Sequence, residues 1–288
     1  MALLALVAGQ DVEPAEGSDG RDGRCRIARK VAEDRVISTV DTQARHTRKS
    51  PEARRDGYRA HVAADPDTGI ITDEKLTKAA AAENSDAAVA AQFVAAEAAA
   101  ASGCGGKLAW YGDSAYGTGE LRQAIAEAGH EAVIKPWPAQ PAVEGGFARD
   151  DFTLDQATRT VTCPAGITRQ ITGRNAVIFG IACRGCPLRA RCTTAKDGRT
   201  LHLHEHEDLL RAARAAWPGL REDYTKHRPH VERTIAQAAT WRGRRLKLRY
   251  RGTVKNNAWL KRRTAAVNLR NLLNRGLARQ NGTWVLTT

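Results

Sequence analysis

The stretch KLAWYGDSAYGTGELRQAIAEAGHEAVIKP (residues 107–136) decides the fold class. KLAWYGD (107–113) predicts a strand that ends in an acid, and TGELRQAIAEAG (118–129) predicts a helix stopped by a glycine. EAVIKP (131–136) predicts a second, short strand that a proline ends. A strand, a helix and a strand in this order favour an α/β sheet. Because such sheets carry their functional sites at strand ends, Asp113 is a candidate site residue.

Upstream of this stretch, the sequence predicts further strands and a helix of the same α/β sheet. RVISTVD (35–41) predicts a strand that also ends in an acid, Asp41. GYRAHVAA (57–64) and IITDEKLT (70–77) predict a β-hairpin with a glycine in its turn. The Ala-rich segment 87–101 predicts a helix.

Downstream, the composition changes twice. The Pro-rich segment 136–146 marks a boundary, and residues 147–206 hold short β-rich pieces around four cysteines. After them, the sequence predicts three helices, at 207–217, 223–241 and 256–277. No internal repeat is evident.

The positive charge lies in the last quarter of the chain. The net charge is +13, yet residues 1–210 hold 26 basic and 29 acidic side chains, whereas residues 211–288 hold 19 basic and 3 acidic ones. A run such as RGRRLKLRYRG (242–252) exceeds what a solvated helix face needs. The asymmetry therefore favours a polyanion partner, most often nucleic acid.

The termini and cysteines bear on the compartment. No apolar run approaches the ~18 residues of a spanning helix, and MALLALVAGQ (1–10) lacks the basic start of a signal peptide. We expect a cytoplasmic, nucleoid-associated protein that touches no membrane. In a reducing compartment the six cysteines are not expected to form a disulfide framework.

Three carboxylates form the chemical hypothesis. Asp41 and Asp113 end predicted strands, and Glu232 lies on a predicted helix inside the basic region. Phosphodiester chemistry uses carboxylates that converge on two divalent ions, and hard oxygen ligands select Mg²⁺ or Mn²⁺. Each acid alone is more simply a turn cap, so the hypothesis depends on the three together.

Several segments resemble bacterial insertion-sequence DDE transposases, and most closely the insertion-sequence group numbered eleven-eighty-two. The resemblance covers about residues 30–280, and the segments that carry it are STVDTQARHTRKS (38–50), DGYRAHVAADPDTGIIT (56–72), YGDSAYG (111–117), HRPHVERTIA (227–236), RYRG (249–252) and AAVNLRNLL (265–273). The third and fourth of these are quite specific.

The resemblance implies a ribonuclease-H-like core, a mixed five-stranded sheet flanked by helices, here with a small Cys-containing β-rich insertion. It implies Asp41, Asp113 and Glu232 as the metal-binding DDE triad. It further implies metal-dependent cleavage at transposon ends, followed by attack of the freed 3′-hydroxyl on target DNA. The expected partners are DNA and a second copy of the chain, as a homodimer on the DNA.

The resemblance also implies DNA-binding residues around Glu232. Arg228 lies one helical turn before Glu232 and could reach a phosphate. The spacing from Tyr224 to Arg228 is one residue longer than in the family, and Ala239 stands where the family has a lysine. The expected phosphate contacts are His46, Lys49, Tyr224, Arg228, Arg242, Arg244, Arg245, Lys247 and Arg249.

The expected domain organisation has four parts. Residues 1–30 are an irregular leader, a remnant of a missing N-terminal region, because the family usually carries a helical domain before the catalytic core. The first part of the core is 31–136, the β-rich insertion is 147–206, and the basic helical part with Glu232 is 207–288.

The insertion holds four cysteines, Cys163, Cys183, Cys186 and Cys192, with one C-x-x-C pair. Four thiolates can form a tetrahedral Zn²⁺ site, and four thiols in a small core are an equally good interpretation. We expect the four sulfurs to cluster.

Two other functions stay open. A basic DNA-binding remnant without activity would bind DNA but not cut it. Another ribonuclease-H-like nuclease would cut DNA but not join the freed end to a target.

Overall fold

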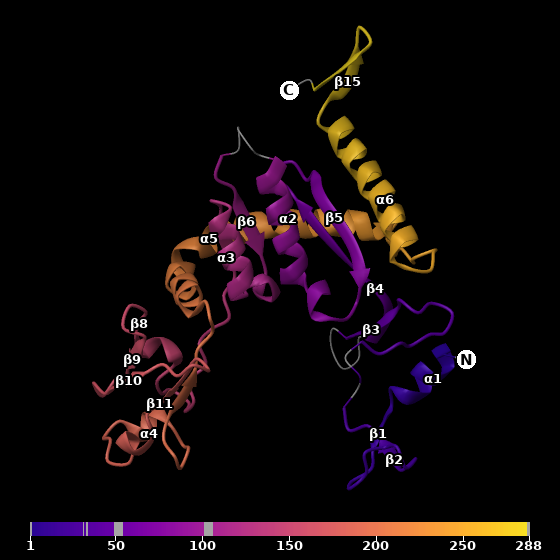
Figure 1. The fold of residues 1–288 in the computed structure, drawn as a ribbon. Helices are drawn as coiled ribbons and strands as arrows, with labels where there is room; N and C mark the ends of the chain where they lie inside the picture. The colour runs from indigo at the N-terminus through magenta and orange to yellow at the C-terminus, as the bar shows by residue number, and fades with distance from the viewer. Residues whose placement is uncertain (1, 31, 33, 49–53, 101–105, 287–288) are drawn as a thin grey trace. The chain divides into compact units, whose positions relative to one another are not determined.

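A computed structural model describes the chain except residues 1, 31, 33, 49–53, 101–105 and 287–288 (Figure 1). The chain divides into two compact units. The first unit comprises Met1–Gly105 and Thr225–Thr288, and the second comprises Gly106–Tyr224. Each unit has its own sheets and helices.

The first unit is built on a three-stranded antiparallel sheet of order β3-β4-β5, with strands β3 (Arg45–Arg48), β4 (Arg54–Ala64) and β5 (Ile71–Lys78). The turn between β4 and β5 needs a left-handed residue, and Gly69 supplies it with φ of 69°. Its backbone N–H donates to the Asp65 carbonyl at 2.8 Å. The predicted hairpin is therefore confirmed.

Helices pack on this sheet. The short η1 (Ala82–Asn84) precedes α2 (Asp86–Ala100), which packs on β4 and confirms the predicted Ala-rich helix. The imidazole of His61 in β4 is buried, 3.2 Å from the Asp86 carboxylate at the start of α2. In β5, Ile71 packs with Ala238 and Val267, two residues from the helices that carry the basic region.

Helix α6 (Thr253–Asn274) borders the strand β5, and asparagine amides join the two. Asn268 both accepts from the Ile71 N–H and donates to the Ile71 carbonyl, each at 2.8 Å. Asn257 accepts from the Leu76 N–H at 2.8 Å. The amides thus bond to backbone groups of β5 that its partner β4 does not use.

The predicted strand 35–41 is wrong. The structure has no strand there; Ser38 Oγ accepts the backbone N–H groups of Val40 and Asp41 at 3.2 and 3.1 Å. Such local side-chain hydrogen bonds compete with a strand ladder. Val40 is exposed, so no core favours the extended form. Asp41 therefore lies in a turn before β3.

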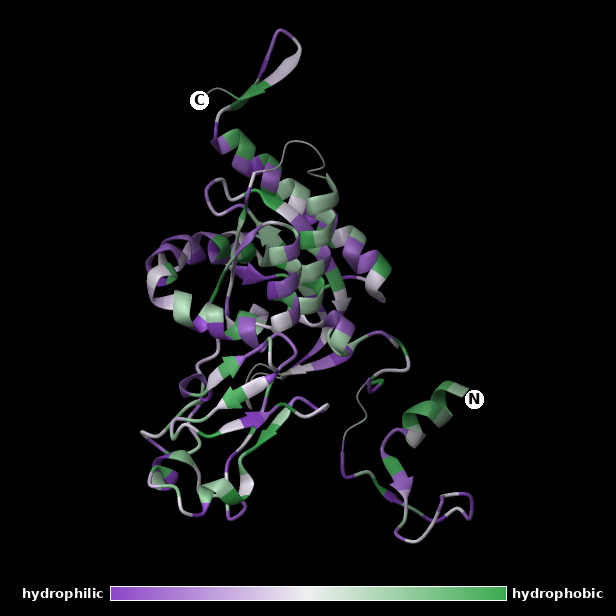
Figure 2. Cartoon of the chain, turned by 60° about the vertical axis from the view of Figure 1, so that its left-hand side comes forward, coloured by the Kyte–Doolittle hydropathy of each residue, from purple (hydrophilic) through white to green (hydrophobic). Residues whose placement is uncertain are grey.

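The N-terminal segment has more structure than the expected irregular leader. It begins with α1 (Ala2–Gly9), which Figure 2 shows as largely hydrophobic. A hairpin of β1 (Val12–Pro14) and β2 (Cys25–Ile27) follows, with an Arg26–Glu13 ion pair of 2.9 Å across it.

The second unit opens with a parallel strand pair. Strand β6 (Ala109–Gly112), the short η2 (Ser114–Tyr116), α3 (Gly119–Glu127) and β7 (Glu131–Ile134) follow in order, as predicted. Thr118 caps α3 by accepting the Leu121 N–H. The expected five-stranded sheet is not observed as one hydrogen-bonded sheet among the described residues. Strands β3, β4 and β5 form one antiparallel sheet, and strands β6 and β7 form a separate parallel sheet.

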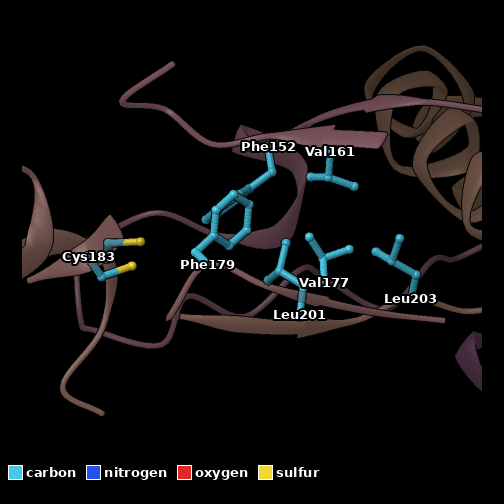
Figure 3. Close-up of a cluster of buried hydrophobic side chains, with 8 residues drawn as sticks. Phe152, Val161, Val177, Phe179, Cys183, Leu201 and Leu203 are labelled. Atoms are coloured by element: carbon cyan, nitrogen blue, oxygen red, sulfur yellow. The ribbon is translucent and has the colours of Figure 1, made fainter. Parts of the chain in front are cut away.

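Residues 147–206 hold short strands within the second unit. The elements of this β-rich segment are η3 (Arg149–Asp151), β8 (Thr153–Asp155), β9 (Thr160–Thr162), β10 (Thr168–Gln170), β11 (Ala176–Ile178), η4 (Gly180–Cys183), α4 (Arg189–Cys192) and β12 (Thr200–His202). They form two small sheets, β10-β9-β8 and β11-β12. Their side chains enclose a compact core around Phe152, Val177 and Phe179 (Figure 3).

Helix α5 (Glu207–Ala239) is one continuous helix of 33 residues, where the sequence predicted two. Pro218 lies inside it, although a proline removes one helical hydrogen bond. Glu207 at its start is buried, and its carboxylate lies 3.0 Å from Arg149 and 3.1 Å from Arg214. The pair with Arg149 ties the first turn of α5 to the β-rich segment, and the pair with Arg214 lies within α5 itself.

Two hairpins complete the chain: β13 (Thr240–Trp241) with β14 (Arg244–Arg245), and β15 (Leu277–Gln280) with β16 (Thr283–Leu286). Helix α6 between them confirms the third predicted helix. Among the described residues, no helix has both the length and the apolar character to cross a membrane.

Candidate functional site

Asp41 is held in one orientation by the first unit. The Tyr58 hydroxyl lies 2.6 Å from both of its carboxylate oxygens, so it donates to the carboxylate. The Gln43 N–H donates to Oδ1 at 3.3 Å. Although Asp41 does not end a strand, its side chain is fixed by the neighbouring β4.

Tyr58 connects Asp41 to the start of α6. Its hydroxyl accepts the backbone N–H of Gly252 at 2.7 Å while it donates to Asp41. Burial, and then the hydrogen bond to the Asp41 carboxylate, raise the pKa of Tyr58 to about 12. The phenol is therefore a neutral donor at physiological pH. Three of the sequence segments that carry the family resemblance meet here.

A second contact supports the same junction. The Gln43 side-chain oxygen accepts from the Thr253 N–H at 2.6 Å and from the Thr253 hydroxyl at 3.0 Å. Gly252 has φ of 78°, which favours glycine. Asn256 donates to the Gly252 carbonyl at 2.8 Å and so closes the turn that precedes α6.

Arg45 contacts the turn that carries Asp41. Its guanidinium is buried and pairs with the Asp34 carboxylate at 2.7 Å. The hydrogen bond from Arg45 lowers the pKa of Asp34. Arg45 also donates to the Thr42 carbonyl at 2.7 Å, next to Asp41. The turn that carries Asp41 is thus supported from two sides.

Asp113 lies directly after β6, as predicted. It caps η2, because its Oδ1 accepts the Ala115 N–H at 2.9 Å. The backbone approaches closely here: a Cβ on Gly112 would lie 2.9 Å from the Tyr116 Cβ. A side chain at position 112 would therefore disturb the turn that presents Asp113.

Glu232 lies on the exposed face of α5. Its side chain is 62% exposed, whereas Thr234 and Ala238 on another face of the helix are buried. Arg228 lies one helical turn earlier and pairs with Glu232 Oε1 at 3.1 Å. The sequence predicted the shared helix face but not this ion pair. The exposure leaves carboxylate oxygens of Glu232 accessible to a ligand.

The three carboxylates belong to different units, Asp41 and Glu232 to the first and Asp113 to the second. Their convergence therefore stays a prediction. Throughout the described part of the chain, no three His, Cys, Asp or Glu side chains are arranged to hold a metal ion as they stand.

The predicted basic residues gather between α5 and α6. The turn of the β13–β14 hairpin has positive φ at Arg242 (49°) and Gly243 (75°), typical of a type I′ turn. Arg263 on α6 anchors the hairpin by donating to the Thr240 carbonyl at 2.6 Å and by lying over the Trp241 ring. The residues that this hairpin and the following loop expose are Arg242, Arg244, Arg245, Lys247 and Arg249.

The remaining predicted DNA contacts are His46, Lys49 and Tyr224, and the structure places each of them differently or does not describe it. His46 in β3 is exposed and hydrogen-bonds the Asp56 carboxylate across the sheet. Lys49 lies outside the described residues. Tyr224 packs edge-on against Trp217, with ring centroids 5.1 Å apart, so a packing role accounts for its ring.

The four cysteines of the β-rich segment line one cavity in the second unit. Cys183 and Cys192 are buried, and Cys163 and Cys186 are half-buried. Burial raises the pKa of the Cys192 thiol, and the charge of Arg199 opposes that rise. All four cysteines thus border the same cavity, and the convergence of their sulfurs stays a prediction.

Residues 162–273 match the family model described as a transposase DDE domain. This stretch contains the four cysteines, all of α5 and most of α6. This part of the chain is therefore similar to a transposase DDE domain, which is consistent with the resemblance carried by the sequence segments. No curated protein and no solved structure matches the chain.

Sequence reasoning missed Tyr58 and Gln43. Both lie inside segments that carry the family resemblance, but their contacts reach residues 194 and 210 positions away. A signal was available in part: a tyrosine that interrupts an otherwise aliphatic and charged strand usually has a partner for its hydroxyl.

Proposed function

We propose that this chain is the catalytic part of an insertion-sequence DDE transposase, of the group numbered eleven-eighty-two. It would cut DNA at transposon ends and join the freed 3′-hydroxyl to target DNA. The observation that carries the proposal is the transposase DDE domain match, which spans Glu232 and the basic hairpin. In this proposal the β3–β5 and β6–β7 strands belong to a ribonuclease-H-like core.

The donor set suits the expected metal. Asp41, Asp113 and Glu232 offer carboxylate oxygens, the hard ligands that Mg²⁺ and Mn²⁺ prefer. Asp41 keeps lone pairs beyond those that Tyr58 occupies. When bound, a pair of divalent ions supplies activation of the attacking oxygen and stabilisation of the leaving oxygen.

The chain's own residues would position the reactants. Tyr58 holds the Asp41 carboxylate through a neutral hydroxyl, which orients the ligand without neutralising its charge. Arg228 pairs with Glu232 in the structure and could transfer its donors to a DNA phosphate. The exposed arginines of the β13–β14 hairpin would follow the DNA backbone, with Trp241 beside them.

The test uses the full chain and a supercoiled plasmid that carries the DNA flanking its gene. With Mg²⁺ or Mn²⁺ present, we expect strand cleavage followed by joining to a second plasmid. Asp41→Asn, Asp113→Asn and Glu232→Gln should each reduce cleavage to background. The matched control is Glu222→Gln, the same change at an exposed glutamate of α5, which should keep activity.

Three results would contradict the proposal. Cleavage by the Glu232→Gln variant at the unmodified rate would remove Glu232 from the triad. Salt-dependent DNA binding without cleavage in either metal would identify a DNA-binding remnant. Cleavage without strand joining would identify a nuclease of another kind. A homodimer on DNA belongs to the same proposal, and the mass of the protein–DNA complex measures it.

A further inference from the structure

The cavity lined by the four cysteines has no role in the proposed DNA chemistry. Its cysteines come from three places in the chain. Cys163 follows β9, Cys183 and Cys186 flank the turn after η4, and Cys192 ends α4. We propose that Cys163, Cys183, Cys186 and Cys192 bind one Zn²⁺ ion as a structural site that holds the β-rich segment together.

The backbone already holds two of these segments as tight turns. At Cys163 the chain reverses between β9 and β10. The Gly166 N–H donates to the Cys163 carbonyl at 2.8 Å, and the Cys163 N–H donates to the Ile167 carbonyl at 2.9 Å. After Cys186, the Arg189 N–H donates to the Cys186 carbonyl at 3.1 Å. Fixed turns of this kind lower the entropy lost when the side chains converge on an ion.

One sulfur already accepts a backbone hydrogen bond. The Arg199 N–H lies 3.4 Å from the Cys183 sulfur. The approach requires Gly198, because a Cβ there would lie 2.4 Å from the Gly180 carbonyl oxygen and 3.2 Å from the Cys183 sulfur. Hydrogen bonds to ligand atoms orient them and stabilise the charge of a thiolate at a metal. The backbone at Gly198 and Arg199 thus packs closely against the Cys183 sulfur.

Two arginines match the charge of such a site. Four thiolates around Zn²⁺ carry a net charge of about −2. Arg189 and Arg199 both line the cavity. The Arg189 guanidinium donates to the Cys183 carbonyl at 3.0 Å, so it is fixed beside a ligand. The Nε atom of Arg199 is buried and has no hydrogen-bond partner in the described part of the chain. A thiolate sulfur would supply the missing acceptor.

The segment also lacks enough core of its own. Its buried cluster has eight members, two of which are Cys183 and Cys192. Figure 3 shows Cys183 at one end of that cluster, beyond Phe179. Small units with so few buried apolar side chains usually need a staple. Thiolate ligands select Zn²⁺ over the hard cations of the proposed triad.

As they stand, the four side chains do not form a group that could hold an ion. Zinc binding would require rotation of the cysteine side chains to bring each sulfur about 2.3 Å from the ion. The thiol and metal-bound forms should therefore differ in how far reagents can reach the sulfurs.

The first measurement is the zinc content of the full chain purified under reducing conditions. We expect one zinc per chain, and a Co²⁺-loaded sample should show the sulfur-to-metal charge-transfer band of tetrahedral thiolate coordination. Cys183→Ser should lose the metal. Cys25→Ser is the matched control, because Cys25 is exposed on β2 in the other unit, and it should keep the metal.

A second measurement covers the case in which Cys183→Ser fails to fold. In the unmodified chain, alkylation of native protein should spare the four cysteines until a chelator is added, and added Zn²⁺ should restore protection. Glu232→Gln should bind zinc normally, so a failure of the proposed function does not affect this result. Absence of zinc with all four thiols alkylated at once, or a mass two hydrogens lower from a disulfide, would overturn the proposal.

Discussion

Replacing Tyr58 by phenylalanine removes one oxygen that joins three parts of the first unit. The hydroxyl donates to the Asp41 carboxylate at 2.6 Å and accepts from the Gly252 N–H at 2.7 Å. Phenylalanine keeps the ring and its packing. The change therefore isolates the hydrogen bonds that hold Asp41 against the start of α6.

The expected loss of stability in Tyr58→Phe follows from these two hydrogen bonds. A hydrogen bond to a charged group contributes about 1.5–3 kcal/mol, and an orphaned buried donor costs about 1–3 kcal/mol. Gly252 is only half-buried, so water replaces part of its lost partner. We expect Tyr58→Phe to lower the free energy of unfolding by about 2 kcal/mol.

The same hydroxyl gives a pH signature. The pKa of Tyr58 is raised from 10.0 to about 12 in the folded chain, first by burial and then by Asp41. A raised acid pKa means that folding favours the neutral phenol. This part of the stability is fully present below pH ~10 and is lost as the pH rises towards ~12. Tyr58→Phe should remove it.

Urea unfolding followed by circular dichroism at neutral pH, and repeated across the alkaline range, measures both effects. Tyr250→Phe is the matched control, because the Tyr250 side chain is exposed on the neighbouring turn. A loss below ~0.5 kcal/mol for Tyr58→Phe, or an unchanged alkaline stability profile, would refute the reasoning about this hydroxyl.

Two further predictions concern charge. Glu207→Ala should lower the free energy of unfolding by about 3–5 kcal/mol, because it removes a buried carboxylate that pairs with Arg149 and leaves Arg214 with Asp150 alone. Thermal unfolding measures the loss, and Glu205→Ala at an exposed site should cost little. Replacing Arg244 and Arg245 by alanine should reduce the slope of log K against log salt by up to about 2 in DNA-binding titrations. A charge-matched control that should leave the slope unchanged replaces two exposed arginines of the N-terminal segment, Arg21 and Arg24.

Local patterns predicted most of the elements. The hairpin 57–77, the α2 helix and the β6-α3-β7 order follow from alternation, caps and breakers within a few residues. The same local reasoning failed at 35–41, where alternation was present but Ser38 bonds to its own backbone. It also failed at Pro218, because one proline did not end a long amphipathic helix.

Candidate residues for the site could be chosen from the sequence, but their contacts could not. Asp41, Asp113 and Glu232 could be chosen from the sequence, and the shared helix face of Arg228 and Glu232 follows from helix periodicity. The Tyr58–Gly252 contact joins residues 194 positions apart, and no local pattern encodes it. Likewise, cysteine spacing indicated one C-x-x-C pair, while the shared cavity of all four depends on the tertiary fold.

The asparagines of α6 have a consequence for the free chain in a cell. A strand at the border of a sheet exposes backbone donors and acceptors that can recruit a strand from another molecule. On β5, Asn257 and Asn268 occupy such groups at Leu76 and Ile71. Helix α6 therefore occupies the edge of β5 to which a strand of another molecule could add. We expect loss of these amides to expose the backbone groups of Leu76 and Ile71 to pairing with a strand of another copy.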